Sequence, residues 1–195
     1  MAGTRRKASS SKKKRGVRKV PKASLVNNQA NPTDIQNVLS QADSALESSN
    51  IEDAMQLFTY AAGGLRNKMQ MQAADLAATD EDKEADALLL SKVLGKMAEA
   101  KVSMGDQQGG QQDFLEATNL LSVDSASNNP IAQAQWKEAR ASLYLYLGQL
   151  SSSSDALEAF TRAITDLNAC AALLEEALKS NSSDENLQHT LVETR

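Results

Sequence analysis

The sequence predicts an all-α protein built from helical hairpins, and three observations support that prediction. Of the 195 residues, 41% are hydrophobic, which is enough for one medium domain that buries its own core. Only seven residues are aromatic and three are proline, whereas Ala, Leu, Gln and Ser are abundant, so a sheet of aromatic and β-branched strands is disfavoured. From Pro32 onward, apolar residues recur at intervals of three and four, which is the spacing of one helical face.

The chain is expected to consist of three parts, of which the first is set apart by its charge. Residues 1–22 contain ten basic residues and no acidic one, whereas the rest of the chain holds 11 basic and 25 acidic residues. We expect residues 1–31 to form a disordered basic tail, because they carry too few large apolar side chains to offset the entropy of ordering. Residues 32–180 are the expected helical domain, and residues 181–195 are expected to form a polar C-terminal tail or short helix.

The basic tail contains a run of four cations, Lys12, Lys13, Lys14 and Arg15. Such a cluster on a flexible segment is typical of a nuclear-import signal, so we expect an import receptor as one partner and a location in both nucleus and cytoplasm. Weak contact with RNA or DNA phosphates, and a solvated tail without a specific role, are the alternatives. A mitochondrial presequence is disfavoured because Val17 is the only sizeable apolar residue between Thr4 and Lys19.

The first expected hairpin begins where Thr33 or Asp34 can cap a helix. The apolar stripe of that helix consists of Ile35, Val38, Leu39, Ala42, Ala45 and Leu46. A polar break at residues 48–50 separates it from a second helix, which carries Ala54, Phe58 and Ala61. We expect the pair Gly63-Gly64 to end or bend this second helix.

A second pair of helices is expected after an Ala-, Gln- and Met-rich stretch. Its first helix begins at Thr79 or Asp80, is closed by Gly105, and is followed by a polar loop through Gly109-Gly110. The residues expected on its inner side are Leu89, Val93, Met97, Ala100 and Met104. Its partner helix runs through Phe114, Ala117, Leu120 and Leu121.

A third pair begins at residues 128–130, where Pro130 can open a helix. The inward residues expected on that helix are Trp136, Ala139, Leu143, Leu147 and Leu150. The last long helix begins within residues 151–155 and is expected to bury Ala156, Phe160, Ala163, Ile164, Leu167 and Leu174.

The second helices contain an internal repeat. Residues 54–61 and 156–163 share small, aromatic and small residues at the same spacing, and Phe114 with Ala117 repeats the last half. This pattern resembles the tetratricopeptide repeat, in which such residues pack the second helix of a hairpin closely against the first. A large apolar residue followed by Gly or Ala, the matching signal of the first helix, occurs at Leu94-Gly95 and again near Leu143.

The resemblance implies a tetratricopeptide-like helical-hairpin solenoid, with an irregular helical bundle as the alternative. The phenylalanines are 56 and 46 residues apart, whereas the family repeats about every 34 residues, so the repeats here are degenerate and their linkers long. The residues that the resemblance assigns to repeat packing are Ala54, Phe58, Ala61, Leu94, Gly95, Phe114, Ala117, Ala156, Phe160 and Ala163.

The sequence contains no recognisable catalytic, cofactor or metal motif. The lone His189 lies in a polar segment without a second histidine or a cysteine pair, and Cys170 lies in an apolar stripe where a buried, inert thiol is expected. The paired glycines lack the Lys and Ser/Thr of a phosphate-binding loop. No apolar stretch approaches about 18 residues, so no membrane span is expected. We therefore expect a binding protein of a reducing compartment, without a cofactor, rather than an enzyme.

The acidic excess of the helical domain favours a basic protein segment as partner. Tetratricopeptide proteins that bind the acidic tails of heat-shock chaperones use a clamp of Lys, Asn and Arg. Here Lys92 and Lys96 suit that clamp, but Leu39 and Asp43 depart from it, so this partner is disfavoured.

The chain also resembles the dedicated assembly chaperones of large-subunit ribosomal proteins. The residues that carry this resemblance are the basic leader through Lys22, the hairpin from Leu39 to Ala61, and the segments 145–150 and 156–163. It implies a helical groove that shields a basic ribosomal protein and a tail that directs import. Members of that family are usually longer, which leaves open a truncated form of a longer array. A general scaffold or co-chaperone adaptor, and an RNA-associated factor whose tail grips phosphates, are the other hypotheses.

Overall fold

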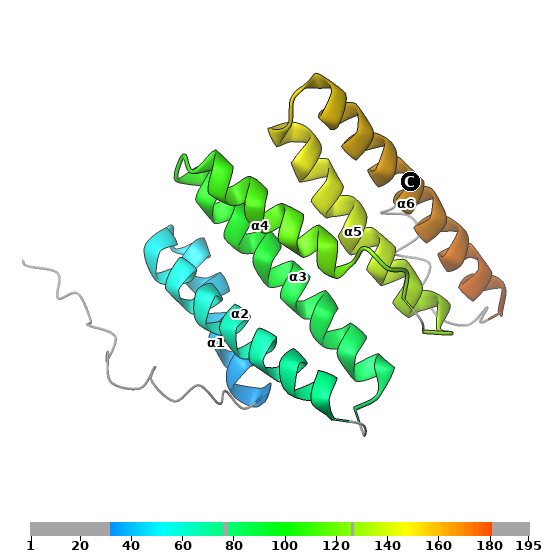
Figure 1. The fold of residues 1–195 in the computed structure, drawn as a ribbon, viewed down its shortest axis with the longest axis horizontal. Helices are drawn as coiled ribbons and strands as arrows, with labels where there is room; N and C mark the ends of the chain where they lie inside the picture. Colours follow the sequence, from blue (N-terminus) through cyan, green and yellow to red (C-terminus); the bar gives the residue numbers. More distant parts are fainter. Residues whose placement is uncertain (1–31, 76–77, 126, 181–195) are drawn as a thin grey trace, which may run out of the picture.

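The computed structural model describes residues 32–75, 78–125 and 127–180. Within these ranges the chain forms helices and no strand, as predicted, and the expected all-α hairpin architecture is confirmed (Figure 1). The helices are α1 (Pro32–Glu47), α2 (Ile51–Ala74), α3 (Asp80–Ser103), α4 (Gln107–Leu120), α5 (Pro130–Leu150) and α6 (Ser153–Ser180). The basic tail and residues 181–195 lie outside the described ranges.

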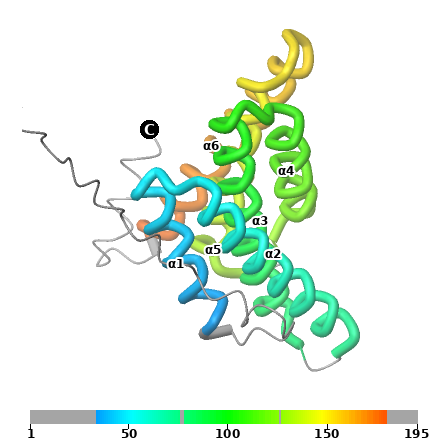
Figure 2. Tube along the Cα trace, turned by 90° about the vertical axis from the view of Figure 1, so that its left-hand side faces the viewer, coloured from blue at the N-terminus to red at the C-terminus, as the bar shows by residue number. Residues whose placement is uncertain are grey.

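The six helices form three hairpins that stand in a row. Each helix packs against the next along the chain, and α3 also contacts α5 across α4. Successive helices run in opposite directions, so α1, α3 and α5 begin at the same end of the molecule (Figures 1 and 2). The result is a repeat-like stack in which the middle hairpin is covered on both sides.

Side-chain caps explain where several helices begin. Thr79 Oγ1 accepts a hydrogen bond from the Asp82 N–H (3.1 Å), and Asn129 Oδ1 accepts one from the Ile131 N–H (2.9 Å). Each cap satisfies a backbone donor that has no partner within its own helix. Gly105 adopts a φ of +89°, which L side chains rarely adopt, and thereby allows the short turn from α3 into α4. Both predicted starts, near residue 79 and at Pro130, are therefore confirmed.

The predictions that Gly63-Gly64 ends a helix and that Gly109-Gly110 lies in a loop were wrong. α2 continues through Gly63-Gly64 to Ala74, because Ala, Leu, Met and Gln on either side favour the helix strongly enough to carry two glycines. Gly109-Gly110 lie inside α4 rather than in a loop. A Cβ at Gly110 would lie 2.9 Å from the Ala98 carbonyl oxygen, so this glycine allows α4 to approach α3 closely.

Two apolar residues predicted to be inward are exposed. Met104 lies just past the end of α3, where it caps the helix with its backbone and points its side chain outward. Ile164 is 58% exposed because no described helix covers that side of α6.

The second helices of the three hairpins share one register. Each carries a small residue, then Phe four positions later, then Ala three positions after that, and the sets are Ala54/Phe58/Ala61, Gly110/Phe114/Ala117 and Ala156/Phe160/Ala163. Gly110 supplies the small residue that the sequence analysis missed in the middle repeat. Ala42 and Ala98, each twelve residues before the small residue of its hairpin, are fully buried on the facing first helix. The repeat therefore places buried small residues at equivalent positions of the first two hairpins.

Candidate binding groove

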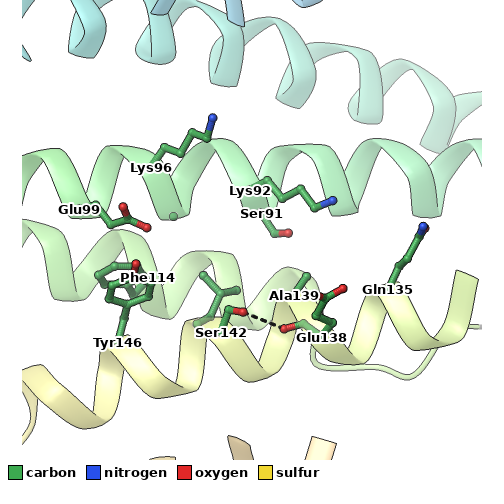
Figure 3. A pocket seen from close by; sticks show the side chains of 12 residues that line it. Ser91, Lys92, Lys96, Glu99, Phe114, Gln135, Glu138, Ala139, Ser142 and Tyr146 are labelled. Atoms are coloured by element: carbon green, nitrogen blue, oxygen red, sulfur yellow. Dashed lines mark hydrogen bonds between the residues drawn. The ribbon is translucent and has the colours of Figure 1, made fainter. Parts of the chain in front are cut away.

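A hollow of about 320 Å³ lies between the first helices α3 and α5 (Figure 3). α3 contributes one face of it and α5 the other, while Phe114 of α4 also lines it. Its polar and aromatic lining side chains include Ser91, Lys92, Lys96, Glu99, Phe114, Gln135, Glu138, Ser142 and Tyr146. We call this hollow, with its extension described below, the α3–α5 groove.

Close helix packing and an aromatic pair form the floor of the groove. A Cβ at Gly95 would be 3.4 Å from Leu143 Cδ2, which is van der Waals contact, so α3 and α5 pack directly against each other here. The rings of Phe114 and Tyr146 are stacked, with centroids 4.9 Å apart and planes within 9°. Burial raises the pKa of Tyr146, and the hydrogen bond of its hydroxyl to Glu99 raises it further. The Tyr146 hydroxyl therefore stays protonated and donates a hydrogen bond to the Glu99 carboxylate.

The two lysines of the groove are in different electrostatic states. Lys96 Nζ lies 2.5 Å from Asp43 Oδ1 of α1, and this ion pair ties the first hairpin to the second. Lys92 is exposed and forms no ion pair or hydrogen bond with any residue that the structure describes. On the opposite side, the exposed Ser142 hydroxyl donates to the Glu138 carbonyl oxygen (3.0 Å). Lys92 is thus the one groove cation of the described chain that is not already neutralised.

The groove extends toward the end of the molecule where α3 and α5 begin. A second hollow of about 270 Å³ shares Gln135 with the first and is lined by Glu81, Glu84, Leu88 and Trp136. The Ser125 hydroxyl donates to Glu84 Oε2 (2.5 Å), and Trp136 Nε1 donates to the Val123 carbonyl oxygen (3.0 Å). These bonds hold the segment between α4 and α5 as one wall of the groove. This end of the groove therefore combines the carboxylates of Glu81 and Glu84 with the apolar side chains of Leu88 and Trp136.

A buried ion pair holds the α5 wall in place, and the sequence analysis missed it. Arg140 donates from Nε and Nη2 to the two carboxylate oxygens of Asp166 on α6, at 2.7 and 2.6 Å. Its Nη1 donates to the Leu121 carbonyl oxygen (3.0 Å), and Asp166 raises the pKa of Arg140. No spacing signal connects two residues 26 apart on different helices, so this pairing could not be found without the fold.

The residues assigned to repeat packing lie in the core rather than along the groove. In the first two hairpins all of them are buried: Ala54, Phe58, Ala61, Leu94, Gly95, Phe114 and Ala117. In the third hairpin Ala163 is buried, but Ala156 and Phe160 are only half-buried. Gly95 and Phe114 alone of this set also line the α3–α5 groove. The import signal, Lys12 to Arg15, lies outside the described residues.

The remaining chemical candidates give no site. Cys170 is buried, and burial, with a further contribution from Glu138, raises the pKa of its thiol. His189 lies outside the described residues. Among the described residues, no three His, Cys, Asp or Glu side chains form a group that could hold a metal ion. In the same ranges, none of the helices has both the length and the apolar character needed to span a bilayer.

No protein-family model matches the chain, and no curated protein matches it.

Proposed function

We propose that the protein binds a basic segment of another protein in the α3–α5 groove. The observation that carries this proposal is the set of carboxylates along the groove, the exposed Glu81 and Glu138 and the half-buried Glu84, around an apolar floor. Between residues 32 and 180 the chain carries 22 acidic and 10 basic residues, so the whole helical body attracts a cationic partner. The groove accordingly offers apolar contact for affinity and carboxylates for selection.

On this proposal the protein is an escort that shields a basic ribosomal protein, and it acts by binding rather than by catalysis. The resemblance of the chain to ribosomal-protein assembly chaperones, and the ten cations before residue 23 that suit import, support this choice of partner. A segment made for ribosomal RNA is rich in Lys and Arg, and an acidic groove would keep it from aggregating or binding other RNA.

Affinity purification of the tagged chain from its own cells, with and without residues 1–22, tests the proposal. We expect one ribosomal protein to co-elute in near-stoichiometric amount with both forms, because the groove and not the tail holds it. Recovery of heat-shock chaperones or of many unrelated proteins would support a general scaffold or adaptor instead. Recovery of RNA that depends on residues 1–22 would support the RNA-associated alternative.

Groove variants separate specific binding from bulk attraction. In the Glu81→Gln/Glu138→Gln chain we expect at least a tenfold loss of affinity for the recovered protein, because two groove carboxylates lose their charge. The matched control is Glu47→Gln/Glu52→Gln, which makes the same change in net charge outside the groove. Glu52 and Glu81 are both exposed and both the second residue of a helix, so the two variants weaken a helix start equally. Equal losses in the two chains would contradict a groove site.

A further inference from the structure

Among the described residues nothing covers the outer face of α6, although the equivalent faces of α2 and α4 are buried. Aligned on the shared phenylalanine, Ile164 of α6 corresponds to Thr118 of α4 and Ala62 of α2. Ile164 is 58% exposed, whereas Thr118 is 6% and Ala62 0% exposed, because α5 packs on α4 and α3 packs on α2. Phe160 and Leu167 are likewise only half-buried, while their equivalents in both earlier hairpins are fully buried. The face of α6 therefore has the composition of a helix-packing surface without a covering helix among the described residues.

The spacing of this face is that of a helix-pairing seam. Its apolar residues follow one another at intervals of three, four, three and four positions, and they are Leu157, Phe160, Ile164, Leu167 and Ala171. Apolar residues in this alternation form the contact line of two helices that pack side by side. We call these five residues the α6 seam.

The α6 seam is complementary to itself in the antiparallel orientation. A two-fold axis between Phe160 and Ile164 brings Leu157 opposite Leu167 of a second chain and Phe160 opposite its Ile164, so each contact occurs twice. The exposed residues along the outer border, Thr161 and Asn168, are uncharged. Glu158, the carboxylate next to Leu157 in the sequence, is paired with Arg162 of its own helix at 2.5 Å. Two copies can therefore approach here although each helical body is strongly acidic.

A head-to-tail arrangement is disfavoured by the other end of the stack. Asp86, which accepts hydrogen bonds from Lys68 and Gln72, marks the face of α3 that meets α2, and Val93, Met97 and Ala100 follow it on that face and are buried. The corresponding residues of α1 are polar and exposed, namely Asn37, Gln41 and Ser44. The outer face of α1 in a second copy is thus polar, whereas the α6 seam of a second copy is apolar. The α6 seam therefore matches a second α6 better than it matches α1.

We propose that two copies of this chain pair through the α6 seam, with their α6 helices antiparallel. The second α6 then takes the place that α3 takes on α2 and α5 takes on α4, in the same antiparallel orientation. This dimer leaves the α3–α5 groove outside the contact residues of the seam. It does not depend on what the groove binds.

Sedimentation equilibrium of the full chain tests the dimer, at concentrations up to about 100 μM so that even weak pairing is populated. We expect a reversible monomer–dimer equilibrium, with dimerisation weakened at least tenfold in Ile164→Glu. The matched control is Leu115→Glu on α4, whose side chain is 48% exposed and lies outside the seam. A chain that is monomeric throughout, as expected if a partner's helix or another segment of this chain covers α6, would overturn the proposal. So would a dimer that Ile164→Glu leaves intact.

Disulfide trapping tests the register of the pairing. In a Cys170→Ala background, we expect Leu157→Cys chains mixed with Leu167→Cys chains to form a covalent heterodimer on mild oxidation. Neither variant alone is expected to cross-link efficiently, because the antiparallel register keeps identical positions apart. Preferential cross-linking of Leu157→Cys with itself would contradict this register.

Discussion

Helices α4 and α6 carry the same pattern of small residue, phenylalanine and alanine, yet their phenylalanines end in different surroundings. Phe114 is 1% exposed, since α5 covers α4 and stacks Tyr146 on its ring. Phe160 is half-buried, since its outer side faces no described helix. The pattern along a second helix determines which side is apolar, whereas the next hairpin determines whether that side is buried. Repeat proteins are stabilised by such neighbour contacts as well as within each repeat.

The largest expected effect of this difference is on unfolding free energy when each phenylalanine is truncated. Phe114→Ala should cost about 3–5 kcal/mol, because it removes a fully buried ring and leaves a cavity. Phe160→Ala should cost about half as much, because part of its ring is already in water and little cavity is left. Urea unfolding of both variants, followed by circular dichroism, measures the two costs. Equal costs would show that α6 is covered as completely as α4.

The sequence was sufficient to predict where the helices form and, for most of them, which side is apolar. Helical spacing and caps located the hairpin turn at residues 48–50 and the helix starts near Thr79 and at Pro130, because these signals are local. Ile164 was placed inward wrongly because its spacing fits an apolar stripe, and only the stack shows that no described helix packs on that side of α6. Exposure of one residue in a repeat depends on an element far away in the sequence.

The groove was less accessible to prediction than the fold. Lys92 and Lys96 were noted from the sequence only as suiting a clamp for acidic chaperone tails, a partner that was disfavoured, and the ion pair of Lys96 with Asp43 spans two hairpins and has no sequence signal. Gly110 was predicted to lie in a loop because glycine is common in turns, whereas here it permits a close contact with the Ala98 backbone. Its place in the repeat, four residues before Phe114, is the signal that could have identified it.

A second large effect is expected within the third hairpin, where Arg140 of α5 pairs with Asp166 of α6. The side chains of Arg140 and Asp166 are only 12% and 8% exposed, so Asp166→Ala removes the buried carboxylate of Arg140 and leaves it the exposed Asp124 as ionic partner. We expect a cost of about 3–5 kcal/mol in unfolding free energy. The control is Glu158→Ala, which breaks the exposed pair with Arg162 on the same helix and should cost at most about 1 kcal/mol. Similar melting temperatures for the two variants would mean that the buried pair does not stabilise the packing of α5 against α6.

A smaller effect should separate the two glycines that permit close helix approach. A Cβ at Gly110 would meet the Ala98 backbone oxygen at 2.9 Å, whereas one at Gly148 would meet only the Phe160 ring, at 2.6 Å. Backbone cannot move aside, but a half-buried ring can turn toward solvent. We therefore expect Gly110→Ala to cost about 1–3 kcal/mol and Gly148→Ala less, despite the shorter contact. Thermal unfolding measures both, and a larger cost at Gly148 would indicate that Phe160 is held as firmly as Phe114.

The smallest expected effect concerns Asp124, which lies between α4 and α5 in the segment that joins the second hairpin to the third. A hydrogen bond from Lys137 Nζ (3.0 Å) and the charges of Lys137 and Arg140 hold the pKa of Asp124 below its ordinary value of 3.8, against a weaker opposing effect of burial. Because the folded state favours the ionised carboxylate, its contribution to stability is present above pH 3.8 and disappears as the pH falls through the lowered pKa. The side chain is 68% exposed, so Asp124→Asn should cost less than about 1 kcal/mol at pH 7.

Urea titrations of the Asp124→Asn variant between neutral and acid pH measure this contribution. We expect its cost to shrink as the pH falls below 3.8, and to be smaller at every pH in a Lys137→Met background, where the main partner is missing. A cost that is constant with pH would mean that Asp124 acts through the shape of the loop rather than through its charge. The third hairpin would then be joined to the second by the hydrogen bond from Arg140 to the Leu121 carbonyl oxygen and by apolar contact, without help from the charge of Asp124.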